Sequence, residues 1–319
     1  MTKSTTRVAA DLQTFTQTEI TAKDVVAKAG RKNLLINGAM QVSQRGTSGT
    51  SGFTVDRWFS WGNITSWSQT GSQNDVLQYV TQANTGVAQR VESKGGGFYS
   101  GNTYTLSFKV NPSVADIEVG VTYRNSNSYL SSILSTSSYS SQVTAGVYST
   151  VEITFTLPTN ADPITYDKHN LQVYIGSSVV NTINLKDVQL ELGSVATDFE
   201  HRSYGEELAL CQRYYQKSRA ATPNQNTFGG HQIAVIAGQE PQAVIRLVPE
   251  MRSAPTVVLY SSYGPGANSQ WYGAAFNTGF STHARAFGGD SIAFIIDNTD
   301  IHAPASGWCE IGWTAEAEL

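Results

Sequence analysis

The chain has 319 residues, which is long enough for two domains. It carries 21 basic and 25 acidic side chains. Charged residues make up only 14% of the chain, against roughly 25% in an average globular protein. The cluster of Arg31 and Lys32 is too small for a phosphate-binding surface, which argues against nucleic acid as a partner. Apolar runs fall short of the roughly 20 residues that cross a bilayer, and the first residues lack the apolar core of a secretory signal.

Residues 1–32 are polar and predict an N-terminal helical attachment segment. Thr21 and Asp24 form a capping pattern, apolar residues follow at 25–27, and Gly30 ends the stretch. A helix of about two turns is marginal by itself, so it would gain stability from a partner surface. A disordered tail is the alternative.

Residues 33–202 alternate between apolar and polar side chains with the period of a β-strand. The alternation is clearest at residues 104–110, 117–123, 151–157 and 171–175. Half-buried antiparallel strands with regular turns predict a β-sandwich. The serine-rich segment 125–141 is a poor strand former, which predicts a long loop or a ragged sheet edge.

The strand that closes this region changes phase along its length. Ile183 and Leu185 lie at odd positions, whereas Val188 and Leu190 lie at even ones. A slip of one residue exchanges the two faces of a strand, so we expect a β-bulge near residues 186–187. Gly193 is expected to end the strand.

A short linking helix is predicted at residues 203–218. Ser203 and Glu206 have the spacing of a capping box. Leu208, Cys211 and Tyr215 then recur at helical spacing and would form one apolar face. The linking helix would therefore join two bodies made of strands.

Residues 219–319 predict a second, smaller β-sandwich. A linker rich in Pro, Asn and Gly comes first, and short strands are expected at 233–237, 243–248, 256–260, 292–296 and 309–315. The two cysteines, Cys211 and Cys309, both lie at apolar positions and are expected to be buried free thiols. A disulfide between them is the alternative.

Several motifs together resemble the tail-fibre and receptor-binding proteins of tailed bacteriophages. They are NLLINGAMQVSQRG (33–46), GFTVDRW (52–58), YTLSFKV (104–110), QLELGSVATDFEHRSYGEELALCQRYYQK (189–217), MRSAPTVVL (251–259) and GWTAEAEL (312–319). The resemblance implies that the first β region is similar to the jelly roll of carbohydrate-binding modules. It also implies a homotrimer.

The resemblance and the strand patterns together predict an all-β chain of four segments. These are a tail-attachment segment (1–32), a jelly-roll β-sandwich (33–202), a linking helix (203–218) and a C-terminal β-sandwich that forms a receptor-binding tip (219–319). As the resemblance implies, the protein would be made in the host bacterial cytoplasm and act in the virion. Its partners would be copies of itself, other tail proteins and host-surface polysaccharide.

The catalytic and metal-binding motifs that we sought are absent from the sequence. It has no Walker A sequence, no H-E-x-x-H, no C-x-x-C and no nucleophile elbow, and its five histidines never have the spacing of metal ligands. The pairs Asp162–Asp167 and Asp297–Asp300 lie in turn-like segments, where Asp commonly bonds its own backbone. We therefore expect no enzyme activity, no cofactor and no catalytic metal; a structural Ca²⁺ in a turn is a weaker hypothesis.

Sugar binding requires an aromatic face for the apolar side of a pyranose, together with amides or carboxylates for its hydroxyls. Residues of this kind fall in three stretches, and the candidates are Tyr263, Asn268, Gln270, Trp271 and Tyr272, then Asn298 and His302, and in the first sandwich Trp61 and Trp67. For the first stretch, the alternative is that the aromatics form a small core of their own. Trp58 in the DRW motif is expected to be a core residue.

The first functional hypothesis is non-catalytic, multivalent attachment of a phage to host glycans, with several weak sugar sites acting together. The second is a structural tail adaptor or fibre segment without a ligand. The third is a glycan depolymerase, which is disfavoured because the sequence lacks the long β-helix repeats that many such enzymes use.

Overall fold

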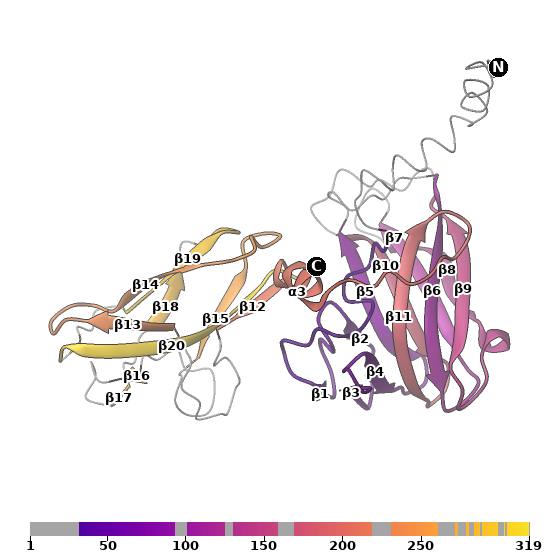
Figure 1. The fold of residues 1–319 in the computed structure, drawn as a ribbon, viewed down its shortest axis with the longest axis horizontal. Coiled ribbons are helices and arrows are strands. Elements are labelled where there is room, and N and C mark those ends of the chain that lie inside the picture. Colours follow the sequence, from indigo (N-terminus) through magenta and orange to yellow (C-terminus); the bar gives the residue numbers. More distant parts are fainter. Residues whose placement is uncertain are drawn as a thin grey trace, which may run out of the picture. The chain divides into compact units, whose positions relative to one another are not determined.

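The computed structural model describes residues 32–92, 101–124, 130–158, 169–218, 231–260, 272–273, 279–280, 284–287, 289–298, 303 and 305–318. The chain divides into two compact units. The first unit comprises Met1–Met40 and Phe59–His201 with Leu319, and the second unit comprises Gln41–Trp58 and Arg202–Glu318. Both units consist mainly of strands (Figure 1). The predicted attachment helix lies outside the described residues, and no described helix is long and apolar enough to cross a membrane.

The first unit is a β-sandwich of two antiparallel sheets. Sheet A has the spatial order β3 (Ser66–Thr70), β4 (Val76–Val80), β11 (Thr182–Leu192), β6 (Thr103–Pro112) and β9 (Ser149–Thr156). Sheet B has the order β2 (Phe59–Trp61), β5 (Thr85–Glu92), β10 (His169–Ser177), β7 (Glu118–Arg124) and β8 (Leu130–Ser138), and a short 3₁₀ helix, η1 (Ser140–Gln142), follows β8. Along the sequence the chain passes repeatedly from one sheet to the other, which is the interleaving of a jelly roll. The described strands therefore form the predicted β-sandwich, but residues 41–58, which the sequence assigned to it, belong to the second unit.

The core of the first unit forms where the apolar faces of the two sheets meet. In β9, Val151, Ile153 and Phe155 are buried, while the residues between them are exposed. The hydroxyl of Tyr79 on β4 donates to the carbonyl oxygen of Ile175 on β10 at 3.1 Å, so a hydrogen bond also joins sheet A to sheet B. The residues that alternate as apolar in the sequence are therefore the ones whose side chains face the core.

The β-bulge predicted in β11 is present. The pairing of β11 with β6 shifts between Lys186 and Gln189, and Asp187 has a φ of 51°. Its carboxylate accepts a hydrogen bond from Lys109 Nζ at 2.9 Å. Because the extra residue restores the phase, Val188 and Ile183 both face the core.

The serine-rich segment contains a strand at the edge of sheet B. Strand β8 pairs only with β7 in the sheet order, and this pairing has two register irregularities. Of the two predictions for residues 125–141, the ragged edge is therefore correct, and the long loop is wrong for the residues of β8. Pairing with β7 supplies the hydrogen bonds that offset the low strand propensity of serine.

The second unit is built around β20 (Gly307–Glu316). This strand pairs with four others, namely β12 (Tyr215–Lys217), β13 (His231–Val235), β15 (Thr256–Tyr260) and β16 (Tyr272–Gly273), and β16 pairs with β17 (Gly279–Phe280). A three-stranded sheet has the order β14 (Gln242–Arg246), β19 (Ala293–Asn298) and β18 (Ala284–Phe287). The unit also contains β1 (Ser48–Gly49) and α3 (Tyr204–Gln212).

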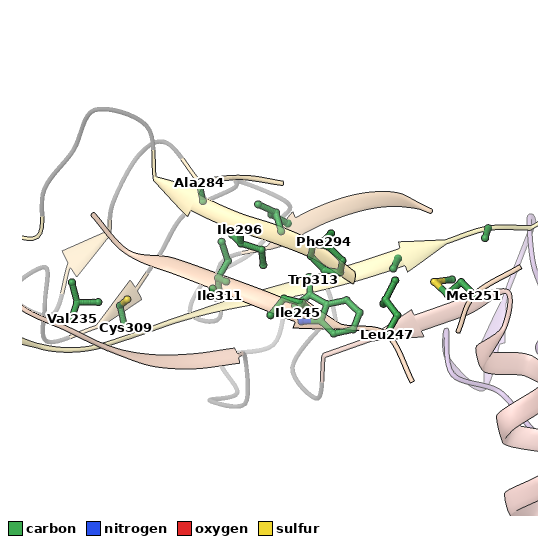
Figure 2. Packing of buried hydrophobic residues seen from close by; sticks show 14 of the residues in the cluster. Val235, Ile245, Leu247, Met251, Ala284, Phe294, Ile296, Cys309, Ile311 and Trp313 are labelled. Atoms are coloured by element: carbon green, nitrogen blue, oxygen red, sulfur yellow. The ribbon is translucent and has the colours of Figure 1, made fainter. Parts of the chain in front are cut away.

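The core of the second unit lies where β20 packs against the three-stranded sheet (Figure 2). Trp313 of β20 packs edge-on against Phe294 of β19, with their ring centroids 5.3 Å apart. Ile245, Ile296 and Ile311 fill the neighbouring space. The second sandwich predicted from the strand pattern is therefore seen in the described residues.

Helix α3 begins as predicted but ends early. The capping box of Ser203 and Glu206 is complete. The helix stops at Gln212, and Tyr215 lies in β12, opposite Glu316 of β20, so the prediction of helix for the end of 203–218 was wrong. The edge of β20 supplies hydrogen bonds to the backbone of these residues. An exposed last turn of the helix would not receive them. Cys211 and Cys309 are both free and buried, as predicted.

A buried ion-pair cluster, here called the arginine clamp, consists of Arg45, Arg57 and Glu318 in the second unit. Arg57 pairs with one oxygen of Glu318, and Arg45 pairs with the other at 3.2 Å. The guanidinium of Arg45 lies 3.8 Å from the ring centroid of Tyr215, and that of Arg57 lies 3.5 Å from the ring centroid of Tyr214. The clamp therefore ties the segment Gln41–Trp58 to the residues after α3 and to the end of the chain.

We expect Glu318→Ala to destabilise the second unit by about 3–5 kcal/mol, because it removes the carboxylate that pairs with the fully buried Arg57 and the shorter of the two carboxylate contacts of Arg45. The side chains of Arg57 and Glu318 are only 3% and 6% exposed. The matched control is Glu316→Ala, which removes a 3.7 Å contact to Arg45 from a carboxylate that is 45% exposed. The control is expected to cost at most about 1 kcal/mol. Chemical denaturation measures both variants; equal, small effects would show that the clamp contributes little.

Candidate functional site

Sheet B presents a face that points away from the core of the first unit. The strand register places Phe59 and Trp61 of β2 on this face together with Ala88 and Arg90 of β5, Gln172 and Tyr174 of β10, and Glu118 and Thr122 of β7. The alternate residues of the same strands, such as Val173 and Val119, are fully buried in the sandwich core. We call this surface the outer face of sheet B.

Three aromatic side chains gather at the β2 end of this face. The ring of Trp61 meets Tyr174 and Phe59 edge-on, with both centroid distances at 6.5 Å. Trp61 remains 41% exposed, whereas Tyr174 is buried. The sheet therefore fixes the orientation of an indole that still offers an open surface.

A guanidinium group lies beside the aromatic side chains of this face. Arg90 packs over the ring of Phe59, with its central carbon 4.7 Å from the ring centroid. Its Nε donates to Gln172 Oε1 at 3.3 Å. Both side chains are thereby held in place on this face, and Gln172 is only 2% exposed.

Two glycines leave the middle of this face without side chains of their own. Gly86 and Gly176 lie directly opposite each other on β5 and β10. A Cβ on Gly176 would lie 2.1 Å from the hydroxyl oxygen of Tyr174, so the phenol ring lies down over this glycine. A Cβ on Gly86 would lie 2.2 Å from the carbonyl oxygen of Ile175. Only glycine leaves room here for the ring and the close backbone.

Strand β7 brings two polar oxygen atoms to the same face. Glu118 Oε2 and Thr122 Oγ1 are shielded from solvent and have no hydrogen-bond partner within the described part of the chain. A shielded oxygen without a partner costs free energy, because the hydrogen bonds that it makes with water are lost. A ligand hydroxyl that reached the carboxylate or the threonine would recover part of this cost.

The nearby carboxylates differ in their protonation behaviour. Burial, and then the charge of Asp116, raises the pKa of Glu118 above its ordinary value. Burial alone would also raise the pKa of Asp116, but hydrogen bonds from Ser177 and Ser178 outweigh it and lower the pKa. Burial and the two carboxylates raise the pKa of Tyr174, so its hydroxyl stays neutral. Glu118 is therefore the carboxylate on this face that loses its charge first in acid.

The chemistry of this face suits a neutral hydroxyl-rich molecule. An open indole can stack on the apolar side of a pyranose, and a carboxylate, a hydroxyl, a carboxamide and a guanidinium can bond its hydroxyls. Among the described residues, no group of three or more His, Cys, Asp or Glu side chains could hold a metal ion.

The structure separates the predicted sugar-binding residues. Trp61 lies on the outer face of sheet B, whereas Trp67 of β3 is 5% exposed and lies opposite Tyr79 in the core, so its predicted exposure was wrong. Its strand phase points the indole inward with Tyr79. Five candidates lie outside the described residues; these are Tyr263, Asn268, Gln270, Trp271 and His302. Tyr272 lies in β16, opposite Glu310 and Phe280, and Asn298 ends β19.

Sequence reasoning missed most members of the outer face. Gln172 and Tyr174 lie between Leu171, Val173 and Ile175, which the sequence assigns to the core. A large aromatic residue at an outward position of a buried strand was the available signal. The register that brings Tyr174 next to Trp61 joins segments more than a hundred residues apart, so local pattern could not give it.

No family model and no curated protein sequence matches the chain. Among solved structures, the N-terminal cellulose-binding domain of Cellulomonas fimi β-1,4-glucanase C is 19% identical, with 49% of this chain and 100% of that one covered and a TM-score of 0.31. The CBM22-1–CBM22-2 tandem of Paenibacillus barcinonensis Xyn10C is 13% identical, with 90% of both chains covered and a TM-score of 0.35. The enzymatically active domain of bacteriophage CBA120 tailspike protein 4 is 11% identical, with 50% of this chain and 21% of that one covered and a TM-score of 0.32. Similarities of this size carry no argument about function.

We expect Gly176→Ala to destabilise the first unit by about 1–3 kcal/mol, because the new methyl group collides with Tyr174 and with the carbonyl oxygen of Thr85. The displaced phenol should also change the fluorescence of Trp61. Gly205→Ala is the control, since a Cβ there meets nothing within 4 Å and the position lies in α3. This control should be neutral or slightly stabilising. Unfolding curves and tryptophan emission test the pair, and an unchanged Gly176 variant would contradict the packing described.

Proposed function

We propose that the outer face of sheet B binds carbohydrate without catalysing its cleavage. One observation carries the proposal: an exposed tryptophan, fixed by Tyr174, shares a sheet face with two polar oxygens that have no hydrogen-bond partner among the described residues. In the proposed complex a pyranose stacks on Trp61, and its hydroxyls reach Glu118, Thr122 and the Arg90–Gln172 pair.

We further propose that the protein is a phage tail fibre or receptor-binding protein that attaches the virion to host-surface glycans. The supporting observation is the sequence resemblance, which includes the motifs at residues 33–46, 189–217 and 312–319. The N-terminal segment would dock on other tail proteins, and the protein would act in the virion. Three weak sugar sites on one homotrimer would bind a polymer far more strongly than one site, because linked sites raise the effective concentration.

The second unit has surface features that fit a homotrimer. Several large apolar side chains are exposed on it, namely Val244, Val248, Val258 and Ile292. Exposed apolar side chains are stabilised when a partner surface covers them. In this proposal the covering surfaces belong to other copies of the chain.

The second candidate function is a structural tail adaptor or fibre segment without its own ligand. The arginine clamp and the same exposed apolar residues favour it, because both serve assembly and neither needs a sugar. A glycan depolymerase is the least supported alternative. Of its predicted carboxylate pairs, Asp162, Asp167 and Asp300 lie outside the described residues.

We expect Trp61→Ala to weaken polysaccharide binding by about tenfold or more, because it removes the stacking surface. The control is Tyr148→Ala, which removes an aromatic side chain of nearly equal exposure, 42% against 41%, just before β9 of sheet A. Affinity electrophoresis in gels that contain xylan, mixed-linkage β-glucan, dextran or galactomannan measures both variants. Light scattering on the same samples gives the molar mass, which decides whether the chain is a trimer.

Two outcomes would count against this assignment. If Tyr148→Ala weakens binding as much as Trp61→Ala, the effect is not specific to the outer face of sheet B. If the wild type binds a polysaccharide and Trp61→Ala binds it equally well, the sugar site lies elsewhere, with the loop of Tyr263 and Trp271 as the next candidate. Failure of the wild type to bind any of these polymers or host cells would favour the structural function.

We expect binding at this face to weaken as the pH falls through the raised pKa of Glu118, which lies above the ordinary 4.5. The ionised carboxylate accepts hydrogen bonds from sugar hydroxyls, and protonation removes half of that capacity. The bond is therefore present above this pKa and lost below it. Asp116 titrates separately, because its pKa lies below its ordinary 3.8.

The matched variant for this prediction is Glu118→Gln. Its binding should be weaker than that of the wild type near neutral pH by about tenfold and should not change over the acidic range where Glu118 titrates. Affinity electrophoresis at several pH values measures both proteins. An identical pH profile for the wild type and the variant would exclude Glu118 from the binding site.

A further inference from the structure

The second unit contains a polar cavity that is separate from the face proposed to bind carbohydrate. It has a volume of about 320 Å³ and is lined by Gly238, Gln239, Glu240, Gln242 and Asp297. These residues belong to the turn between β13 and β14, to the start of β14, and to β19. In Figure 1 the turn lies at the end of the second unit opposite to α3.

The backbone of this turn is held in one shape. The amide of Gly238 donates to the carbonyl oxygen of Ala303, and the amide of Ala303 donates to the carbonyl oxygen of Gln239, both at 2.9 Å. Ala237 N also bonds Ser306 Oγ at 2.9 Å, and Gly238 has a φ of 81°, which favours glycine. The turn is thus fixed to the segment before β20, and its side chains project from a preformed frame.

The floor of the cavity is also fixed. Asp297 is only 8% exposed and lies directly opposite Gln242 in the pairing of β14 with β19. The side chains of Gln239, Glu240 and Gln242, by contrast, are exposed. The cavity therefore combines one buried carboxylate, set by the sheet, with three polar side chains at its rim.

The lining determines which molecules the cavity can hold. Every described lining side chain beyond the glycine is a carboxylate or a carboxamide, so an apolar molecule would gain nothing from them to offset their dehydration. Among the described lining residues only Glu240 and Asp297 are acidic, and no described cluster of His, Cys, Asp or Glu could hold a metal ion. Carboxylates accept from hydroxyls, and carboxamides both accept and donate, which matches adjacent hydroxyl groups on a sugar ring.

We propose that this cavity is a second saccharide site, which binds one terminal sugar residue of a neutral glycan end-on. Its volume is at the lower end of ligand pockets, so it suits a single ring better than a chain. Its described lining residues include no aromatic side chain and can contact a ligand through hydrogen bonds, whereas the outer face of sheet B offers a stacking platform. The proposal does not rest on the function proposed for that face, and a chain with both sites would engage a polysaccharide along its length and at its end.

The test uses the full-length chain with Trp61→Ala, so that the outer face of sheet B no longer contributes. The probes are the methyl glycosides of glucose, galactose, mannose and N-acetylglucosamine, observed by saturation-transfer NMR and titrated by chemical shift. We expect saturable, weak binding of at least one glycoside. Adding Glu240→Ala and Gln242→Ala should weaken it by about tenfold, since each removes a hydrogen-bonding side chain from the rim.

The controls separate this site from the rest of the surface. Gln232→Ala removes an exposed glutamine of β13 that does not line the cavity and should leave binding unchanged. Asp297→Asn keeps the shape of the buried side chain and should also weaken binding. Because Glu240 and Gln242 are exposed, their substitution should not alter the unfolding curve, which is measured on the same samples.

Three results would overturn the proposal. One is the absence of binding of every glycoside to the Trp61→Ala chain. Another is binding that the Glu240→Ala and Gln242→Ala pair leaves unchanged. The last is an equal loss in the Gln232→Ala control. If Trp61→Ala abolishes polymer binding while a glycoside still binds at the cavity, both sites are supported. If Trp61→Ala does not change polymer binding and a glycoside still binds at the cavity, only the function proposed for sheet B fails.

Discussion

The second unit depends on the arginine clamp more than on any single apolar contact. Arg45 and Arg57 come from a segment more than 140 residues before α3, yet they share the carboxylate of Glu318 near the end of the chain. Two guanidinium groups in a buried site require a compensating charge, and their flat faces also need cover, which Tyr214 and Tyr215 supply. The pairing of β12 with β20 is consistent with this cover, because it places Tyr215 next to the residues that lead to Glu318. The motifs DRW and GWTAEAEL are therefore two halves of one ion-pair cluster.

A second polar cluster, here called the latch, consists of Asn33, Glu191, Thr197 and Glu200 in the first unit. It explains the positions of other residues in the quoted motifs. The carboxylate of Glu191 accepts hydrogen bonds from the amide and hydroxyl of Thr197 at 2.8 and 2.7 Å. Glu200 accepts from the amide of Asn33 at 2.8 Å, and Asn33 in turn accepts from Leu190 N. The run that leaves the last strand of the sandwich is thus bonded to the run that enters the unit. Buried carboxylates with satisfied oxygens restrict the chain to one arrangement, which explains why such residues lie in strand and loop positions where apolar residues would be expected.

The sequence was sufficient for features that depend on neighbours along the chain. It predicted the period-two strands, the bulge demanded by the phase slip in β11, and the capping box of α3, because each is set within about ten residues. It failed where a distant strand decided the outcome. Tyr215 left the helix for β12 because β20 offers a partner edge, and Trp67 turned inward with Tyr79. The outer face of sheet B was not predicted as a site. The sequence identified Trp61 alone; it predicted strands around Tyr174 and Glu118, but not the pairing that places them on the same face as Trp61.

The residues of the quoted motifs are therefore not the residues of the candidate site, and there is a physical reason for this separation. Of the residues behind the resemblance, Arg57, Glu191 and Glu318 are buried charged groups, and replacing them would have a large cost to folding. Trp61, Glu118 and Thr122 lie on an outer face, outside the quoted motifs, where a different side chain would leave the sandwich core intact. A scaffold of this kind can keep its buried ion pairs while the side chains of its outer face vary. For that reason the motifs identify the architecture, whereas the ligand must be sought on the outer face of sheet B and in the cavity beside Asp297.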